Sequence, residues 1–181
     1  YDRPSTWDDE DGDCISDRHE VLMAQHLDGD GAYPLVISAN GCFVETGRWL
    51  DPYDDIYYYS ASNVQIDHVI ALYESWVSGL GNLSSSLQRR SANTGSLAEG
   101  VLPETSHNFL AVGASSNGEK GSSDPTEWMP RNDAYHCTYL KKWVLTKSQN
   151  ELLFDQAEFD FIQAREVDCD DEPLPELPAN S

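Results

Sequence analysis

Four widely spaced cysteines constrain the fold of this chain more than any other feature. Cys14, Cys42, Cys137 and Cys169 form no Cys-x-x-Cys pair, which argues against a zinc knuckle. An even number of distant cysteines is typical of proteins from oxidising compartments, so we expect two disulfides and a secreted, extracellular protein. Three pairings are possible. Pairing of nearest neighbours would tie down the two ends of the chain.

Those two ends also carry most of the charge. The 181 residues have a net charge of −21, of which residues 1–47 and 148–181 contribute −9 each and residues 48–147 only −3. Nucleic-acid binding depends on Lys and Arg, so the nearly balanced middle keeps such a partner open although the whole chain is acidic. No run of 18 apolar residues occurs, so we expect no membrane span or membrane partner. We expect a monomer.

Apolar patterning predicts a single α+β domain. Strands are predicted at residues 36–37, 42–44, 64–72 and 108–112. Helices are predicted at residues 17–27, 73–80, 83–92, 134–147 and 151–165.

Other segments have no such pattern. The Gly- and Ser-rich residues 113–123 predict a loop, and Asp124 followed by Pro125 predicts the start of a helix. Residues 170–181 are acidic and proline-rich, and we expect them to be a disordered tail.

Asp67 and His68 lie side by side inside the clearest predicted strand. Burying both side chains is costly unless they are hydrogen-bonded or used in chemistry. Adjacent strand residues point to opposite faces, so the two can share a site only where the strand bends or ends. A twisted hairpin would satisfy this condition.

The stretch 65–130 resembles the HNH nuclease motif, also called the ββα-metal or His-Me finger motif. It is most similar to secreted HNH-family proteins related to the C-terminal domain of the GmrSD restriction system, over roughly residues 1–169. The resemblance therefore implies a nuclease domain at 1–169, with a ββα-metal core at about 64–130 surrounded by helices. The matching segments are Trp7-Asp8-Asp9, Cys14, Asp17–Leu22, Gly41-Cys42, Gly47–Trp49, Asp51–Tyr53, Ile66–Val69, Ala92-Asn93, Asn108–Val112, Ser116-Asn117, Lys120-Gly121, Asp124-Pro125, Glu127-Trp128, Pro130 and Cys137–Tyr139.

The resemblance implies a role for each of five polar residues. His68 would be the general base that activates water, and Asn108 would brace the catalytic loop. Asp67 and Asn117 would ligate a divalent metal, with Glu127 as an outer ligand. An Asn ligand favours Mg²⁺ or Mn²⁺ over Zn²⁺, because these ions prefer oxygen donors.

Basic residues complete the implied site. Lys120, Arg48 and Arg18 would contact the phosphates of the substrate. The alternative for Lys120 is an ordinary surface lysine, and for the two arginines it is a structural ion pair with the acidic N-terminal arm.

The expected function is that of a secreted, metal-dependent endonuclease. It would cut DNA, or RNA as well, with little sequence preference, because no base-reading module is visible. One alternative is an RNase of the same fold. The other is a non-catalytic acidic secreted protein that binds calcium or another ligand, since Asp9, Asp11 and Asp13 alternate around Gly12. Their spacing does not fit an EF-hand, so a solvated acidic arm is predicted instead.

Overall fold

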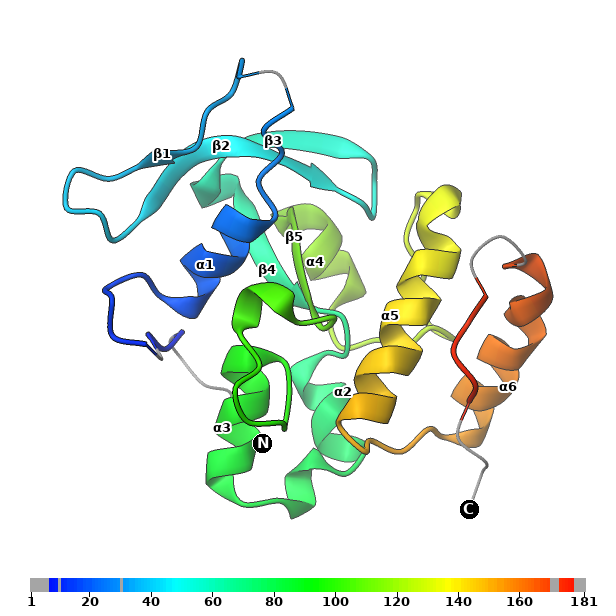
Figure 1. Cartoon of the computed structure of the whole chain (residues 1–181). Helices are drawn as coiled ribbons and strands as arrows, with labels where there is room; N and C mark the ends of the chain where they lie inside the picture. Colours follow the sequence, from blue (N-terminus) through cyan, green and yellow to red (C-terminus); the bar gives the residue numbers. More distant parts are fainter. Residues whose placement is uncertain (1–6, 10, 30, 170–172, 178–181) are drawn as a thin grey trace.

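An antiparallel ribbon of two strands, β4 (Val64–His68) and β5 (Phe109–Gly113), lies at the centre of the fold. The computed structural model describes residues 7–9, 11–29, 31–169 and 173–177. Val64 lies opposite Gly113, and His68 opposite Phe109. Helix α4 (Ala114–Lys120) follows β5 directly, which makes a strand–strand–helix unit (Figure 1). The other α-helices in the described residues are α1 (Asp17–Ala24), α2 (Leu72–Val77), α3 (Ser85–Thr94), α5 (His136–Gln149) and α6 (Gln156–Arg165).

A second, antiparallel sheet has the strand order β1 (Val36–Ile37), β2 (Val44–Asp51) and β3 (Ile56–Ser60). Asp51 at the end of β2 is fully buried, and its Oδ2 accepts a hydrogen bond of 2.9 Å from the backbone N–H of Gly113. Burial raises the pKa of Asp51 above its ordinary value. This carboxylate therefore joins the three-stranded sheet to the end of the central ribbon.

The ribbon is buried on both faces, and strand alternation decides which residue faces which core. Leu110 and Val112 pack in a cluster with residues of α5 and α6, such as Trp143 and Ile162. Phe109 and Ala111 pack in a second cluster with residues of α1 and β2, which include Val21, Leu22, Val44 and Trp49. Figure 1 shows α1 on one side of the ribbon and α5 with α6 on the other. Two cores on opposite sides of one ribbon thus make a single α+β domain.

Two disulfides, Cys14–Cys42 and Cys137–Cys169, close the domain near its two ends. The expected number of bonds is confirmed, and the observed pairing is the one between nearest neighbours. No helix in the described part of the chain is long and apolar enough to cross a membrane.

Three local predictions were wrong. Residues 114–120 form α4 instead of a loop. Asp124 opens a turn instead of a helix, because its Oδ1 accepts from the N–H of Thr126 and its backbone carbonyl accepts from the N–H of Glu127. In the tail, Leu174 is buried in the core beside α5 and α6, whereas residues 170–172 and 178–181 lie outside the described chain.

Candidate active site

Asp67 lies on the face of the ribbon that meets α4 and α5, and two donors hold its carboxylate. Lys120 Nζ lies 2.9 Å from Oδ1, and the Tyr53 hydroxyl donates to Oδ2 at 2.6 Å. Asp67 is 4% exposed and the Lys120 side chain is fully buried. Burial raises the pKa of Asp67, although the Lys120 charge opposes that shift. Both carboxylate oxygens are therefore engaged by groups of the protein itself.

His68 points to the opposite face, as alternation along β4 requires. Its Nε2 lies 2.7 Å from the backbone carbonyl oxygen of Ala92 in α3. A carbonyl oxygen only accepts, so Nε2 carries the hydrogen in this contact. In the neutral imidazole Nδ1 is then the basic nitrogen. Asp67 and His68 are therefore adjacent in sequence but lie on opposite faces of the ribbon. The expectation that a twisted hairpin would bring them into one site was wrong.

Aromatic rings fix the orientation of the His68 imidazole. Trp7 stacks on it at a centroid distance of 5.6 Å, and Phe109 meets it edge-on at 4.9 Å. Asp8, next to Trp7, accepts hydrogen bonds from Arg89 at 2.8 and 2.6 Å and from the side-chain amide of Asn93. These hydrogen bonds from Arg89 lower the pKa of Asp8. The segment before the first disulfide is thereby fastened to α3, with Trp7 over His68.

Sequence reasoning missed the roles of these neighbours. Trp7, Asp8, Asn93 and Tyr53 lie in segments on which the resemblance to the HNH family rests. The resemblance therefore marked these positions. It did not indicate that Tyr53 bonds Asp67 or that Asp8 bonds Asn93, since nothing local in the sequence relates positions so far apart.

Asn108 clamps the chain that leaves β4. Its side-chain Oδ1 accepts from the N–H of Ile70 at 2.7 Å, and its backbone carbonyl accepts from the N–H of Val69 at 2.8 Å. Asn108 is buried, so both contacts are shielded from water. Asn108 directly precedes Phe109, the partner of His68 in the ribbon, and its two bonds hold the segment that follows His68.

The other two implied metal ligands do not converge on Asp67. Asn117 in α4 donates from its side chain to Gln65 Oε1 at 2.7 Å, at the solvent edge of the same ribbon face. Glu127 is exposed in the turn that begins at Asp124. With both oxygens of Asp67 taken and Asn117 turned to Gln65, the arrangement does not fit a divalent ion at Asp67.

Of the three residues expected to contact phosphate, Lys120 needs correction, and the two arginines make bonds of their own. Lys120 is buried and bonded to Asp67, so it is neither a surface lysine nor open to a substrate. Arg18 donates to the backbone carbonyls of Ala61 and Val64 at 2.8 and 2.9 Å, where burial lowers its pKa. Arg48 donates to the carbonyl of Leu27 at 3.2 Å. Arg18 and Arg48 thus bond backbone carbonyls around α1 and the three-stranded sheet.

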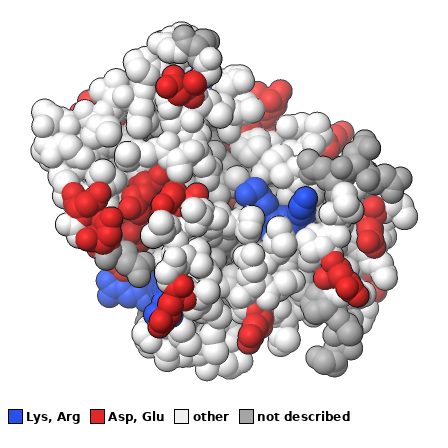
Figure 2. All heavy atoms as spheres, in the orientation of Figure 1, with Lys and Arg blue, Asp and Glu red and all other residues white. Residues whose placement is uncertain are grey.

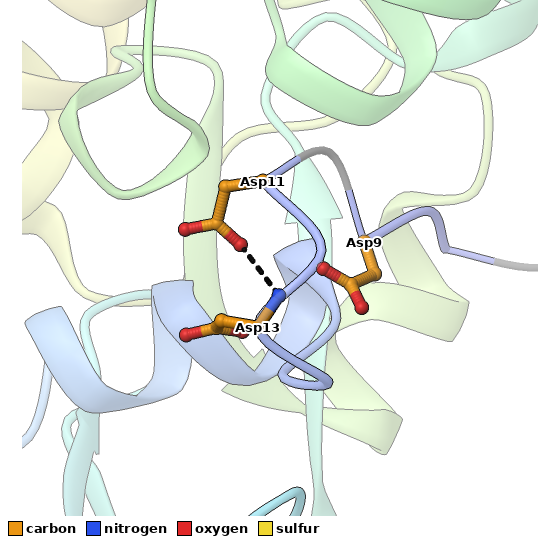
Figure 3. A group of neighbouring side chains, drawn as sticks. All are labelled: Asp9, Asp11 and Asp13. Carbon is orange, nitrogen blue, oxygen red and sulfur yellow. Dashed lines mark hydrogen bonds between the residues drawn. The ribbon is translucent and has the colours of Figure 1, made fainter.

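Asp9, Asp11 and Asp13 gather in the loop before α1 (Figure 3). One carboxylate oxygen from each of the three lies within 4.8 Å of the others, which is close enough for all three to contact one metal ion. Their carboxylates cap the loop, because Asp9 accepts from the N–H groups of Gly12 and Cys14 and Asp13 accepts from that of Ile15.

The pKa of Glu20 in α1 is raised to about 7. The main causes are burial and the charge of Glu104, and smaller contributions come from Asp17, Asp11 and Asp13. Figure 2 shows acidic side chains gathered over the α1 side of the molecule, with basic side chains in smaller separate groups. The surface over α1 is therefore rich in acidic side chains.

Comparisons with known proteins give one informative match. The chain is 33% identical over 117 residues to an uncharacterised secreted protein of Arthroderma benhamiae. The match covers 65% of this chain and 53% of the relative, so the chain spans about half the length of the protein it matches. No protein family model and no solved structure match the chain. A secreted relative and two disulfides confirm the prediction that the protein is secreted.

Proposed function

We propose that the protein is a secreted endonuclease that hydrolyses phosphodiester bonds of DNA, with His68 as the general base. The arrangement of elements supports this proposal, because two paired strands lead into a helix and His68 ends the first strand, with α2 and α3 inserted between the two strands. Asn108 and Asn117 lie at the start of the second strand and in the helix, where the HNH motif expects polar side chains.

The contact between His68 Nε2 and the Ala92 carbonyl carries the proposal. A general base must keep one nitrogen unprotonated and hold it in a fixed direction. The carbonyl keeps the hydrogen on Nε2, and the Trp7 and Phe109 rings hold the imidazole plane. His26 and His136 also hold Nε2 against a backbone carbonyl, so what distinguishes His68 is its place at the end of β4 together with the two rings that hold its plane.

The proposed chemistry passes through His68 and one water molecule. His68 Nδ1 takes a proton from the water as its oxygen forms a bond to phosphorus. The bond from phosphorus to the leaving oxygen breaks, and the leaving oxygen takes a proton from solvent. No step is assigned to an ion, because Asp67 and Asn117 do not fit one as arranged. Dependence on Mg²⁺ or Mn²⁺ is the part of the proposal that the assay below decides.

The test is degradation of supercoiled plasmid by the purified protein at low salt. We would compare Mg²⁺, Mn²⁺, Ca²⁺ and EDTA, with a single-stranded RNA in parallel. His68→Ala is the test variant. His26→Ala is the matched control, because His26 also bonds a backbone carbonyl, that of Tyr33, but lies outside the ribbon. The proposal predicts nicking and linearisation by the parent protein and the control, and none by His68→Ala.

Other outcomes separate the alternatives. Cleavage of RNA alone would make the protein an RNase of the same fold. Equal behaviour of the parent and His68→Ala would contradict the proposal and leave the acidic binding protein as the better account. Loss of cleavage in EDTA would establish the metal requirement without saying where the ion binds.

A further inference from the structure

We propose that the ammonium group of Lys120 is the resident counter-ion of Asp67, in the place where the HNH motif would hold a divalent metal. The inference concerns the same site as the proposed function. It is a statement about binding, and it can be tested with no nucleic acid present.

Each oxygen of Asp67 already has a donor from the protein. Lys120 Nζ lies 2.9 Å from Oδ1 and the Tyr53 hydroxyl donates to Oδ2 at 2.6 Å. Each carboxylate oxygen keeps a further lone pair. A divalent ion that used it would have to give up its water beside a fully buried ammonium, because Asp67 is only 4% exposed and the Lys120 side chain is fully buried.

The charges are already balanced. A buried carboxylate next to a buried ammonium forms a neutral pair, whereas an added divalent ion would leave excess positive charge in a site of low dielectric. Tyr53 adds a neutral donor to that pair, and its pKa lies well above the ordinary value because of burial and the nearby Asp67 charge. The hydroxyl therefore keeps its hydrogen for Asp67.

Lys120 is also bound by the strand itself. Its Nζ donates to the backbone carbonyl of His68 at 2.8 Å in addition to Asp67. The helix end that carries Lys120 and the strand end that carries His68 are thus joined by one cation. A hydrated surface lysine or a phosphate contact would make neither bond.

The experiment measures Mn²⁺ binding by electron paramagnetic resonance and by Mn²⁺-dependent thermal stabilisation. The main variant is the pair Asp67→Asn with Lys120→Met, which is close to isosteric and removes both charges together. We expect its Mn²⁺ affinity to equal that of the parent within about twofold, because Mn²⁺ does not use Asp67. A tenfold or greater loss of affinity in the pair would overturn the proposal.

The single variant Lys120→Met gives the converse result. It leaves the Asp67 carboxylate without its cation, so we expect a lower melting temperature and a larger stabilisation by Mn²⁺ than the parent shows. A melting temperature equal to that of the parent would contradict the proposal. If Lys120→Met does not fold, the double variant still decides the question. Both readouts stand whether or not the protein cleaves nucleic acid, so the two proposals fail separately.

Discussion

Replacement of Lys147 by Met tests a second buried ionic network, apart from the one at Asp67. Lys147 in α5 is fully buried, and its Nζ contacts Glu158 Oε2 at 2.6 Å and Glu74 Oε1 at 2.7 Å. It also donates to Ser78 Oγ at 3.1 Å and the carbonyl of Leu153 at 3.0 Å. Met fills most of the same volume but leaves two carboxylates without their cation. Removal of one partner of a buried ion pair costs about 3–5 kcal/mol, so we expect that loss in the free energy of unfolding.

The loss should depend on pH. Burial raises the pKa of Glu158, and the Lys147 charge opposes that shift, so the variant should raise this pKa further. A carboxyl group with a raised folded-state pKa stays neutral in the fold at low pH and destabilises it as pH rises. The destabilisation should therefore be smaller near pH 5 than near pH 8.

The assay is urea unfolding followed by tryptophan fluorescence at both pH values. Lys141→Met on the same helix is the control, because Lys141 is only partly buried, and it should change stability by about 0.5 kcal/mol or less. A loss below about 1 kcal/mol at either pH, or a larger loss at the lower pH, would refute the reasoning from burial and pairing.

Three further predictions concern other parts of the fold. Glu20→Gln should be more stable than the parent at high pH but not at low pH. The pKa of Glu20 is raised to about 7, so the parent loses stability as pH rises from the ordinary pKa of Glu towards 7. Equal urea midpoints of the two proteins at both extremes of pH would contradict this. Replacing Cys137 and Cys169 by Ala should cost about 3–4 kcal/mol in urea unfolding, since their disulfide closes a loop with a sequence separation of 32, and an unchanged midpoint would oppose the prediction. Asn108→Ala should cost about 1–3 kcal/mol in the same measurement, because the buried N–H of Ile70 loses its acceptor, and an unchanged urea midpoint would count against a hydrogen-bonding role.

The sequence predicted those features that depend on pattern alone. Widely spaced cysteines predicted two disulfides, and apolar spacing predicted the buried side of α5, on which Leu140, Trp143, Val144 and Lys147 all lie. The strand predicted at 64–72 is confirmed only for Val64–His68, since the chain leaves the ribbon after His68 and α2 begins at Leu72.

Features that depend on distant contacts could not be predicted. Residues 114–120 have poor helix formers, so their sequence indicates a loop, and α4 is held by tertiary bonds from Ser116 to Asp54 and from Lys120 to Asp67. The burial of Lys120 follows from a partner 53 residues away. The sequence did predict that Asp67 and His68 point to opposite faces of a regular strand; it could not show that β4 keeps this alternation to its last residue.

The central claim is that His68 Nδ1 takes the proton from the attacking water. The most direct measurement compares the cleavage rates of the parent and His68→Gln on the same plasmid, because the Gln amide can still donate to the Ala92 carbonyl but cannot act as a base. The account predicts that the parent cleaves and that the variant, folded and equally stable, is slower by about 10²–10⁴-fold. Equal rates in the two proteins, or no cleavage by the parent under any metal, would contradict it.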